Sequence, residues 1–327
     1  MQYELLENQT FAVEGPIQTT ATSLNIPFAK YHDGYMLPIS KIKNNGFKDR
    51  DFTEITIGAA VSEIGDYAFS GVNAKQITFA HKGLDINYNY QSASLKLTIG
   101  KNAFAENGAV QKIILPAALK TINDYAFYSC TKLVNVSFER EVVSLSNIGN
   151  FVFQDNISMT DNAIIRLLIN DSSSIGKFTK VGDGIFRNTN ISNVLTSDDK
   201  LTNKIVWRGK LLHVYYPTGF ATDLFFEENE IAGYAFVDAG NDDVKITLHF
   251  TNPNVIINAK AFSMLHTSVD KIYLKKDKTS VKIENVHVDA FDSTIDHQVS
   301  VFTNNYMTWD EKFRAVTSFG KVKFVDD

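Results

Sequence analysis

The residues best suited to contact a partner lie at alternating positions of two short segments, 244–250 and 271–275. Alternating residues of a strand lie on the same side of a sheet. A tyrosine offers a rigid contact surface, lysines attract an acidic partner, and a histidine changes its charge near neutral pH. The alternative interpretation is an ordinary solvated face. We predict a ligand-binding surface that consists of Lys245, His249, Lys271, Tyr273 and Lys275.

Residue types that carry catalysis lack the spacing that catalysis requires. The chain has seven histidines, but no pair has the HExxH spacing of a metal site. It also has no GxSxG elbow, no GxxxxGK[ST] loop and no calcium loop. The single cysteine, Cys130, has no histidine nearby in sequence and is expected to be a small buried thiol. We therefore expect no enzyme, no cofactor and no bound metal.

A repeated sequence pattern predicts the strands and turns that must position these residues. An Ile or Val is followed five residues later by a Phe, usually with a small residue just before the Phe. Recurrence every 20 to 50 residues or so indicates stacked repeats. The pairs are Ile42–Phe47, Ile64–Phe69, Ile99–Phe104, Ile122–Phe127, Ile148–Phe153, Val181–Phe186, Ile231–Phe236, Ile257–Phe262 and Val286–Phe291.

Each pair is followed by a short run of alternating apolar residues, which is typical of a strand with one buried face. Such a unit cannot bury its apolar side alone, so stacked units must bury it against each other. We therefore expect the Phe side chains to form a ladder in the core. The predicted fold is a mostly-β solenoid of about nine irregular coils, with short helical turns and a cap at each end.

The segment 113–138, IILPAALKTINDYAFYSCTKLVNVSF, resembles the BspA-type leucine-rich repeats of bacterial surface proteins. That family pattern is an apolar strand, a Pro or Gly turn, an Ile-Gly-x-x-Ala-Phe segment and a Cys-containing link into the next strand. Segment 55–71, ITIGAAVSEIGDYAFSG, is nearly as close. The resemblance covers about residues 40–295, although the spacing is irregular and the Cys position is filled only at Cys130.

The resemblance implies a non-enzymatic binding module outside the cell or on its surface. Its partners would be a host matrix protein, another cell-surface protein or a glycan. A structural spacer that projects another domain from the surface is the alternative function. The first residues, MQYELLENQT, are polar and acidic and do not form a signal peptide. We expect an extracellular or cell-surface protein whose signal peptide is absent from this sequence. A cytoplasmic location is the alternative.

We predict three parts of the chain: an N-terminal cap over 1–40, the solenoid over 41–302 and a C-terminal cap over 303–327. Asp33-Gly34 and Arg208-Gly209 predict hairpins, the second inside an insertion near 187–228. Residues 304–313 could form a short helix before a final KVKFV strand. The predicted outward strand positions also include Arg166 and Leu168.

Composition limits the class of partner. The 32 basic and 37 acidic side chains give a net charge of −5, which argues against a nucleic-acid-binding surface of the usual basic kind. No apolar run reaches the ~18 residues that are needed to span a bilayer. We expect a monomer.

Overall fold

The structure, a computed structural model, is a mostly-β solenoid of about eight turns, close to the nine coils expected. It describes residues 1–15, 20–80, 96–140, 144–171, 178–191, 194–195, 201–202, 204–214, 223–236, 245–262, 268–276, 279–287, 289–290, 299–303 and 322–325. The chain divides into two compact units. Unit 1 consists of Met1–Leu167 and Ser174–Asn190, and unit 2 of Leu168–Ser173 and Ile191–Asp327.

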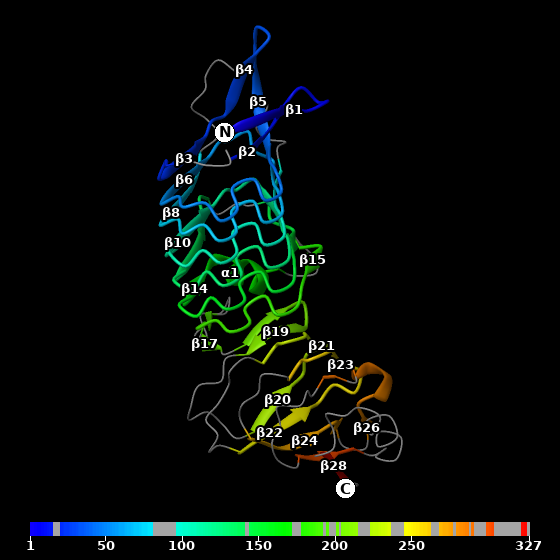
Figure 1. The fold of residues 1–327 in the computed structure, drawn as a ribbon. Coiled ribbons are helices and arrows are strands. Elements are labelled where there is room, and N and C mark those ends of the chain that lie inside the picture. Colours follow the sequence, from blue (N-terminus) through cyan, green and yellow to red (C-terminus); the bar gives the residue numbers. More distant parts are fainter. Residues whose placement is uncertain are drawn as a thin grey trace. The chain divides into compact units, whose positions relative to one another are not determined.

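Two sets of strands run through unit 1, and neighbouring strands in each set are parallel except for two antiparallel pairs at the N-terminal end (Figure 1). The first set consists of β3 (Ser23–Ile26), β6 (Glu54–Ile57), β8 (Gln76–Phe79), β10 (Lys112–Leu115), β12 (Asn135–Phe138) and β14 (Asp161–Asn162). The second set consists of β1 (Gln2–Leu5), β2 (Phe11–Glu14), β5 (Tyr35–Ile42), β7 (Glu63–Ile64), β9 (Leu97–Ile99), β11 (Leu119–Ile122), β13 (Asn147–Ile148) and β15 (Lys180–Val181), and β4 (Ala29–His32) pairs with β5.

Strands of the first set follow the predicted alternation. In β6, Ile55 and Ile57 are buried while Glu54 is exposed, and β8 and β10 repeat this order. β6 and β8 pair in parallel with Ile55 beside Ile77, so apolar residues of successive coils meet on the inner face. This register explains why the sequence pattern recurs with the same parity in each coil.

The predicted Phe ladder is confirmed for the anchors that the structure describes. In unit 1 the rings stack with centroids 5.2–5.9 Å apart and planes within 12° of parallel. Burial of a Phe side chain stabilises a fold by roughly 1.5–3 kcal/mol, so the ladder is a main source of stability. The buried anchors are Phe47, Phe69, Phe104, Phe127, Phe153, Phe186, Phe236 and Phe262, whereas Phe291 lies outside the described residues.

The turn that carries each Phe is tightened by residues with left-handed backbone. In the coil of Phe127, Tyr125 has φ 57° and Ser129 has φ 54°. The backbone N–H groups of Tyr125, Phe127 and Ser129 donate to carbonyl oxygens of the next coil, and the N–H of Phe127 reaches the carbonyl of Val152 at 2.9 Å. Other coils of unit 1 repeat these bonds, which join each turn to the next one.

The N-terminal segment adds strands to both sets. β2 pairs in parallel with β5, and β3 pairs in parallel with β6. The predicted hairpin at Asp33-Gly34 is confirmed, because β4 and β5 pair antiparallel around two residues with positive φ. We propose that residues 1–40 act as the N-terminal cap, since they cover the strands of the first full coil.

One predicted strand is instead a helix. Residues Ala163–Ile169 form α1, the one α-helix in the described part of the chain. Leu168, which the alternation placed outward, is buried. The side chain of Asn162 accepts the N–H of Ile164 at 2.9 Å, which caps the start of the helix. The run Ile164–Ile165 with Leu168 has helical spacing, so the period-two interpretation was wrong here.

Unit 2 contains the remaining strands. The strands are β16 (Val194–Leu195), β17 (Leu201–Thr202), β18 (Lys204–Trp207), β19 (Lys210–Val214), β20 (Asp223–Phe226), β21 (Glu230–Ile231), β22 (Lys245–Phe250), β23 (Ile256–Ile257), β24 (Ser268–Tyr273), β25 (Lys275–Lys276), β26 (Thr279–Ser280), β27 (Val299–Phe302) and β28 (Val322–Val325), with a 3-10 helix at Ile283–Asn285. β18 and β19 form the predicted hairpin at Arg208-Gly209, and β28 is the predicted last strand. The helix predicted at 304–313 lies outside the described residues.

Candidate functional site

The candidate site lies on the five-stranded parallel sheet of unit 2, whose order is β20-β22-β24-β27-β28 (Figure 1). Phe226, Leu248, Phe250 and Ile272 are buried on one face of this sheet. Alternation therefore places the residues between them on the opposite, outer face. Parallel pairing then aligns these outer residues into two rows that cross the strands.

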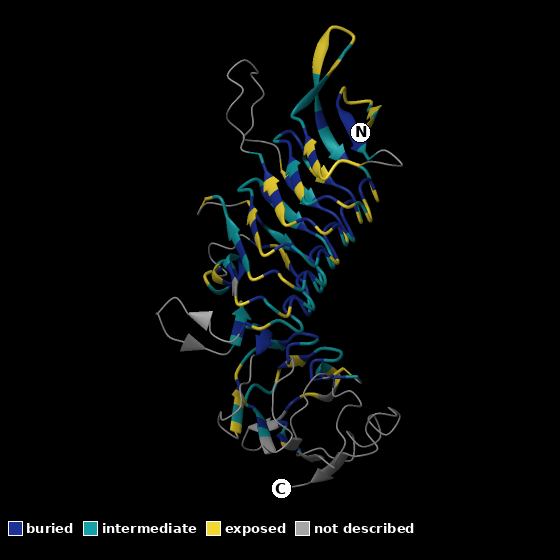
Figure 2. Cartoon of the chain, turned by 60° about the vertical axis from the view of Figure 1, so that its left-hand side comes forward, coloured by how far each residue is buried: buried dark blue, intermediate teal, exposed yellow. Residues whose placement is uncertain are grey.

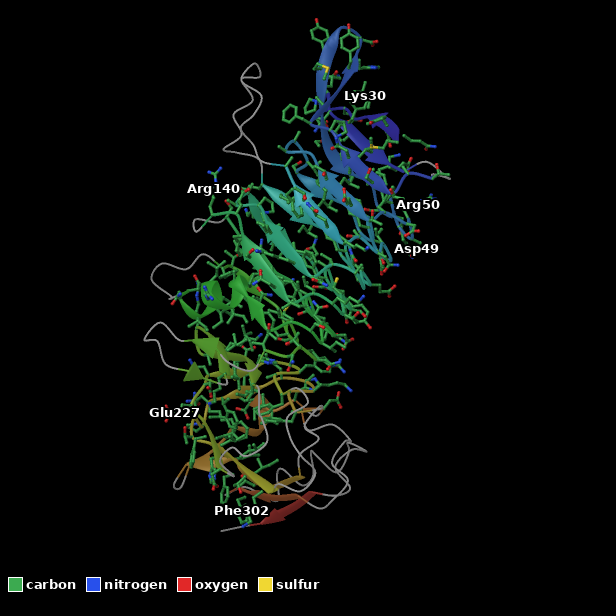
Figure 3. All side chains as sticks on the ribbon, turned by 90° about the vertical axis from the view of Figure 1, so that its left-hand side faces the viewer. Lys30, Asp49, Arg50, Arg140, Glu227 and Phe302 are labelled. Carbon is green, nitrogen blue, oxygen red and sulfur yellow. The ribbon has the colours of Figure 1, made fainter. Side chains whose placement is uncertain are left out.

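The first row is aromatic, and we call it the aromatic row: Phe225, His249, Tyr273 and Phe302. These residues are direct partners in the strand register. Successive ring centroids are 4.4, 4.8 and 4.5 Å apart, and the planes lie 13°, 2° and 10° from parallel. Figure 3 labels Phe302, the last ring of the row. The rings thus stack face to face, at about the distance between neighbouring strands.

The aromatic row is partly open to solvent. Phe225 is 56% exposed, whereas its neighbour in the chain, Phe226, is 1% exposed. The other three rings are half-buried between their neighbours. Exposed aromatic rings in a cluster mark interaction surfaces more strongly than scattered apolar residues do.

The second row is polar and runs beside the aromatic row. Register places Asp223, Thr247, Lys271, Ser300 and Lys323 in line. The imidazole Nε2 of His249 lies 2.8 Å from Oδ1 of Asp223, which joins the two rows. Lys271 is exposed, and no acidic side chain among the described residues forms an ion pair with it. The polar row therefore presents a positive group beside the rings.

Lys204 covers the edge of the sheet at β20. Its Nζ donates to the carbonyl oxygen of Phe225 at 2.9 Å and lies 3.0 Å from Oε1 of Glu228. The same ammonium group lies 4.7 Å from the centroid of the Phe226 ring. Since one edge carbonyl already has a donor, a partner gains less by adding a strand here than by lying on the outer face.

Three of the five predicted binding residues come together on this face. His249 and Tyr273 stack, and Lys271 lies two residues before Tyr273 in β24. Lys245 begins β22 beside Ser268, and its side chain lies outside the described residues. Lys275 is not in β24, because that strand ends at Tyr273 and Lys275 pairs with Ser280 in a separate hairpin.

Sequence reasoning missed Phe225, Asp223 and Phe302. The first two lie in β20, within the segment 187–228 that we interpreted as an insertion with a single hairpin. The alternation in Asp223–Phe226 was the available signal, since the apolar Phe226 precedes the anchor Ile231. Phe302 follows from the alternation already recognised at Val299 and Val301, which makes it an outward residue of β27.

The corresponding outer face in unit 1 is different in chemistry. Figure 2 shows exposed positions along its strands β6, β8 and β10. These residues are Glu54, Gln76, Thr78, Lys112 and Ile114. Ile114, at 47% exposure, is the apolar exception among them. Because they are mostly polar and none is aromatic, this set supplies controls and not a candidate site.

Unit 1 also has a cavity of about 400 Å³ at the ends of its first-set strands. Lys96, Glu139 and Arg140 supply its charged groups, and Pro116 and Leu97 are among its apolar ones. Oε1 of Glu139 accepts the N–H of Ala117 at 3.0 Å, so it holds a turn. The charged groups do not form a nucleophile–base arrangement of the kind that catalysis needs.

Two titratable groups among the described residues have large pKa shifts, and both are fully buried. Burial raises the pKa of the Cys130 thiol to about 12, and burial lowers the pKa of His213 to about 4. Cys130 is thus the buried thiol that the sequence predicted. Within the described ranges, no group of three or more His, Cys, Asp or Glu side chains could hold a metal ion. A helix with the length and apolar character to span a membrane is likewise absent from those ranges.

Parallel strands with one buried Phe in each coil define a leucine-rich repeat solenoid. The family model for the BspA type leucine rich repeat region matches residues 40–98 and 97–205, with six copies. The chain therefore belongs to the BspA-type leucine-rich repeat family. No curated protein matches it.

Several solved structures are similar to this chain at low identity. The pneumococcal vaccine antigen PcpA is 14% identical, with 100% of this chain and 95% of that chain covered and a TM-score of 0.48. A leucine-rich cell surface protein from Faecalibacterium prausnitzii is 15% identical, with 99% and 93% covered and a TM-score of 0.49. A leucine-rich repeat protein from Bacteroides ovatus is 14% identical, with 99% and 98% covered and a TM-score of 0.41.

Proposed function

We propose that this chain is a non-enzymatic binding module of a bacterial surface, and that it adheres to a protein or glycan through the outer face of the sheet in unit 2. The observation that carries the proposal is the aromatic row beside Lys271. Aromatic rings supply much of the energy of protein interfaces, because they bury a large area at a small cost in side-chain entropy. A row of four such rings on an outer sheet face is a suitable centre for a contact.

Membership of the BspA-type family supports the extracellular part of the proposal. Leucine-rich repeats offer an extended surface in place of a closed pocket. We accordingly propose partners among host matrix proteins, other cell-surface proteins and glycans, with the chain acting as a monomer. A nucleic-acid partner does not suit the net charge of −5.

The alternative function, a spacer, makes a different prediction for the aromatic row. In a spacer the rings would serve only as cross-strand pairs, each worth roughly 0.2–1 kcal/mol to the sheet. Removal of one ring would then lower stability without any effect on adhesion. The exposure of Phe225 favours a binding role, since a purely structural ring gains more from burial.

The experiment measures adhesion directly. Beads coated with the whole chain are tested against a panel of matrix proteins, glycans and host cells. A variant with Lys271→Glu and Tyr273→Ala is compared with the unaltered chain and with Ile114→Ala, which removes an exposed apolar side chain from unit 1. We expect at least a tenfold loss of adhesion for the double variant alone. Equal adhesion by all three, or none to any panel member, would contradict the proposal.

A further inference from the structure

We propose that the partner of the aromatic row is an acidic polypeptide segment, whose carboxylates meet the ring edges and the ammonium group of Lys271. This inference rests on the proposed function and narrows it from protein or glycan to protein. The reasons are the orientation of the rings, the charge of the polar row and the length of the strip.

Orientation is the first reason. Since the planes of successive rings lie within 13° of parallel, His249 has a ring on each face, and so does Tyr273. What these two rings present to solvent is therefore their edges. The edge of an aromatic ring is the positive part of its quadrupole, and the face is the negative part. Edges attract carboxylate oxygens, and the tip of Tyr273 adds a hydroxyl donor.

The same orientation disfavours a sugar. A saccharide packs its weakly positive C–H groups on the negative face of a ring, so it needs a free face. The rings with only one stacked neighbour are those at the ends of the row, Phe225 and Phe302. A polysaccharide laid along the row would meet edges at His249 and Tyr273, where its C–H groups gain little.

Charge is the second reason. Asp223, the acidic member of the polar row, has its carboxylate within 2.8 Å of the His249 imidazole. Lys271 is exposed and has no acidic partner among the residues described. A negatively charged partner complements this arrangement.

Length is the third reason. The three centroid separations span about 14 Å in total. An extended polypeptide rises ~3.4 Å per residue, so a segment of about four residues reaches from Phe225 to Phe302. In such a segment successive side chains alternate, and every second carboxylate can lie against the row. A short acidic stretch within a larger protein is therefore sufficient.

The test uses two probes with equal numbers of carboxylates: a fluorescent, C-terminally amidated peptide of twelve glutamates and a fluorescent oligogalacturonate of twelve units. Both are titrated with the whole chain at about 20 mM and 300 mM salt and followed by fluorescence anisotropy. We expect the peptide to bind at least tenfold more tightly than the uronate, and to lose affinity at the higher salt concentration. We expect Lys271→Ala and Phe225→Ser each to weaken peptide binding at least tenfold.

Matched control variants distinguish binding at this face from general electrostatic attraction between the peptide and the chain. Lys112→Ala removes an exposed lysine from an outer strand of unit 1, and Tyr35→Ala removes a 72% exposed tyrosine from β5. Both should bind the peptide as the unaltered chain does. Circular dichroism checks the fold of every variant, and tryptophan fluorescence adds a check for the variants in unit 2, where Lys271→Ala alters an exposed side chain.

Each outcome decides between the proposals. No peptide binding, or binding that Lys271→Ala and Phe225→Ser leave unchanged, overturns the inference. Tighter binding of the uronate, lost in the same two variants, overturns the polypeptide partner but supports the binding face. If these variants also adhere normally to the panel of proteins, glycans and cells, the proposed function fails as well.

Discussion

The thiol of Cys130 donates to the backbone carbonyl oxygen of Phe104, one coil earlier, with the sulfur 3.2 Å from the oxygen. The backbone N–H of Cys130 donates in turn to Oδ1 of Asn156, one coil later, at 2.7 Å. One residue thereby connects three successive coils. Its fully buried sulfur explains why a small residue is needed at this position.

Cys130 should be unreactive in the folded protein. Burial raises its pKa to about 12, and the thiolate is the form that reacts with thiol reagents. We expect an aromatic disulfide reagent at pH 8 to label the thiol only after denaturant is added, which absorbance measures directly. Cys130→Ser provides the blank. Stoichiometric labelling of the native chain within minutes would contradict the position assigned to this side chain.

Phe127→Ala should be strongly destabilising. The ring lies between Phe104 and Phe153, at 5.4 and 5.5 Å, and its removal leaves a cavity that the stacked coils cannot close. We expect a loss of about 3–5 kcal/mol in the free energy of unfolding. Because each coil contacts mainly its neighbours, hydrogen exchange should increase first in the adjacent coils.

The control for Phe127→Ala is Ile114→Ala, which removes an apolar side chain from an exposed position. Its cost should stay within about 0.5 kcal/mol. Exchange that rises equally in every coil after Phe127→Ala would argue against local coupling along the stack.

His213 should make unit 2 less stable in mild acid. Its pKa is lowered by burial from about 6.5 to about 4, so between these values the unfolded chain binds a proton that the folded chain does not. The free energy of unfolding therefore falls as the pH falls through this window. From pH 7.5 to pH 5 this group should account for about 2 kcal/mol.

Urea unfolding followed by tryptophan fluorescence measures this effect, since Trp207 and Trp309 both belong to unit 2. His213→Leu replaces the imidazole with an apolar side chain of similar size, which cannot bind a proton in this pH range. The stability of the variant should fall less between pH 7.5 and pH 5 than that of the unaltered chain. An equal fall in both would show that His213 is not the source.

Ser129 tests the left-handed turn position. Its φ of 54° is unfavourable for residues with a branched Cβ, whereas glycine adopts it freely, and Gly71 occupies the matching position of another coil. We expect Ser129→Val to lower the free energy of unfolding by about 1–2 kcal/mol. Ser129→Gly should change it by less than about 0.5 kcal/mol, because relief of strain offsets the added freedom of the unfolded chain. Thermal unfolding of both variants measures these changes. Equal effects of Ser129→Val and Ser129→Gly would contradict a left-handed backbone at this position.

Residues that repeat were predictable from the sequence, and residues that depend on long-range register were not. The anchors Phe47 to Phe262 recur in a fixed local frame, so their burial followed from spacing alone. The stack of His249 on Tyr273 could be anticipated only as a shared face. Phe225 was missed although its strand alternates, because β20 lies in a segment without the repeat and spacing alone does not reveal its partner strand. Lys275 was expected on the same face because alternation alone does not reveal where a strand ends, and β24 ends at Tyr273.

The hydrogen bonds that the N–H groups within the Phe turns donate have a further consequence, because these bonds run in one direction. The N–H groups of Phe69, Phe104 and Phe127 each donate to a carbonyl of the following coil, and in unit 2 the N–H of Phe262 does the same toward Ala290. The peptide dipoles of these turns therefore add along the stack, as they do in a helix. The stack of turns in each unit is therefore electrically polar, with partial positive charge toward the C-terminal coil and partial negative charge toward the N-terminal coil. A chain cut after a complete coil would expose a row of backbone donors, and an anion in solution would be drawn to that end and not to the other.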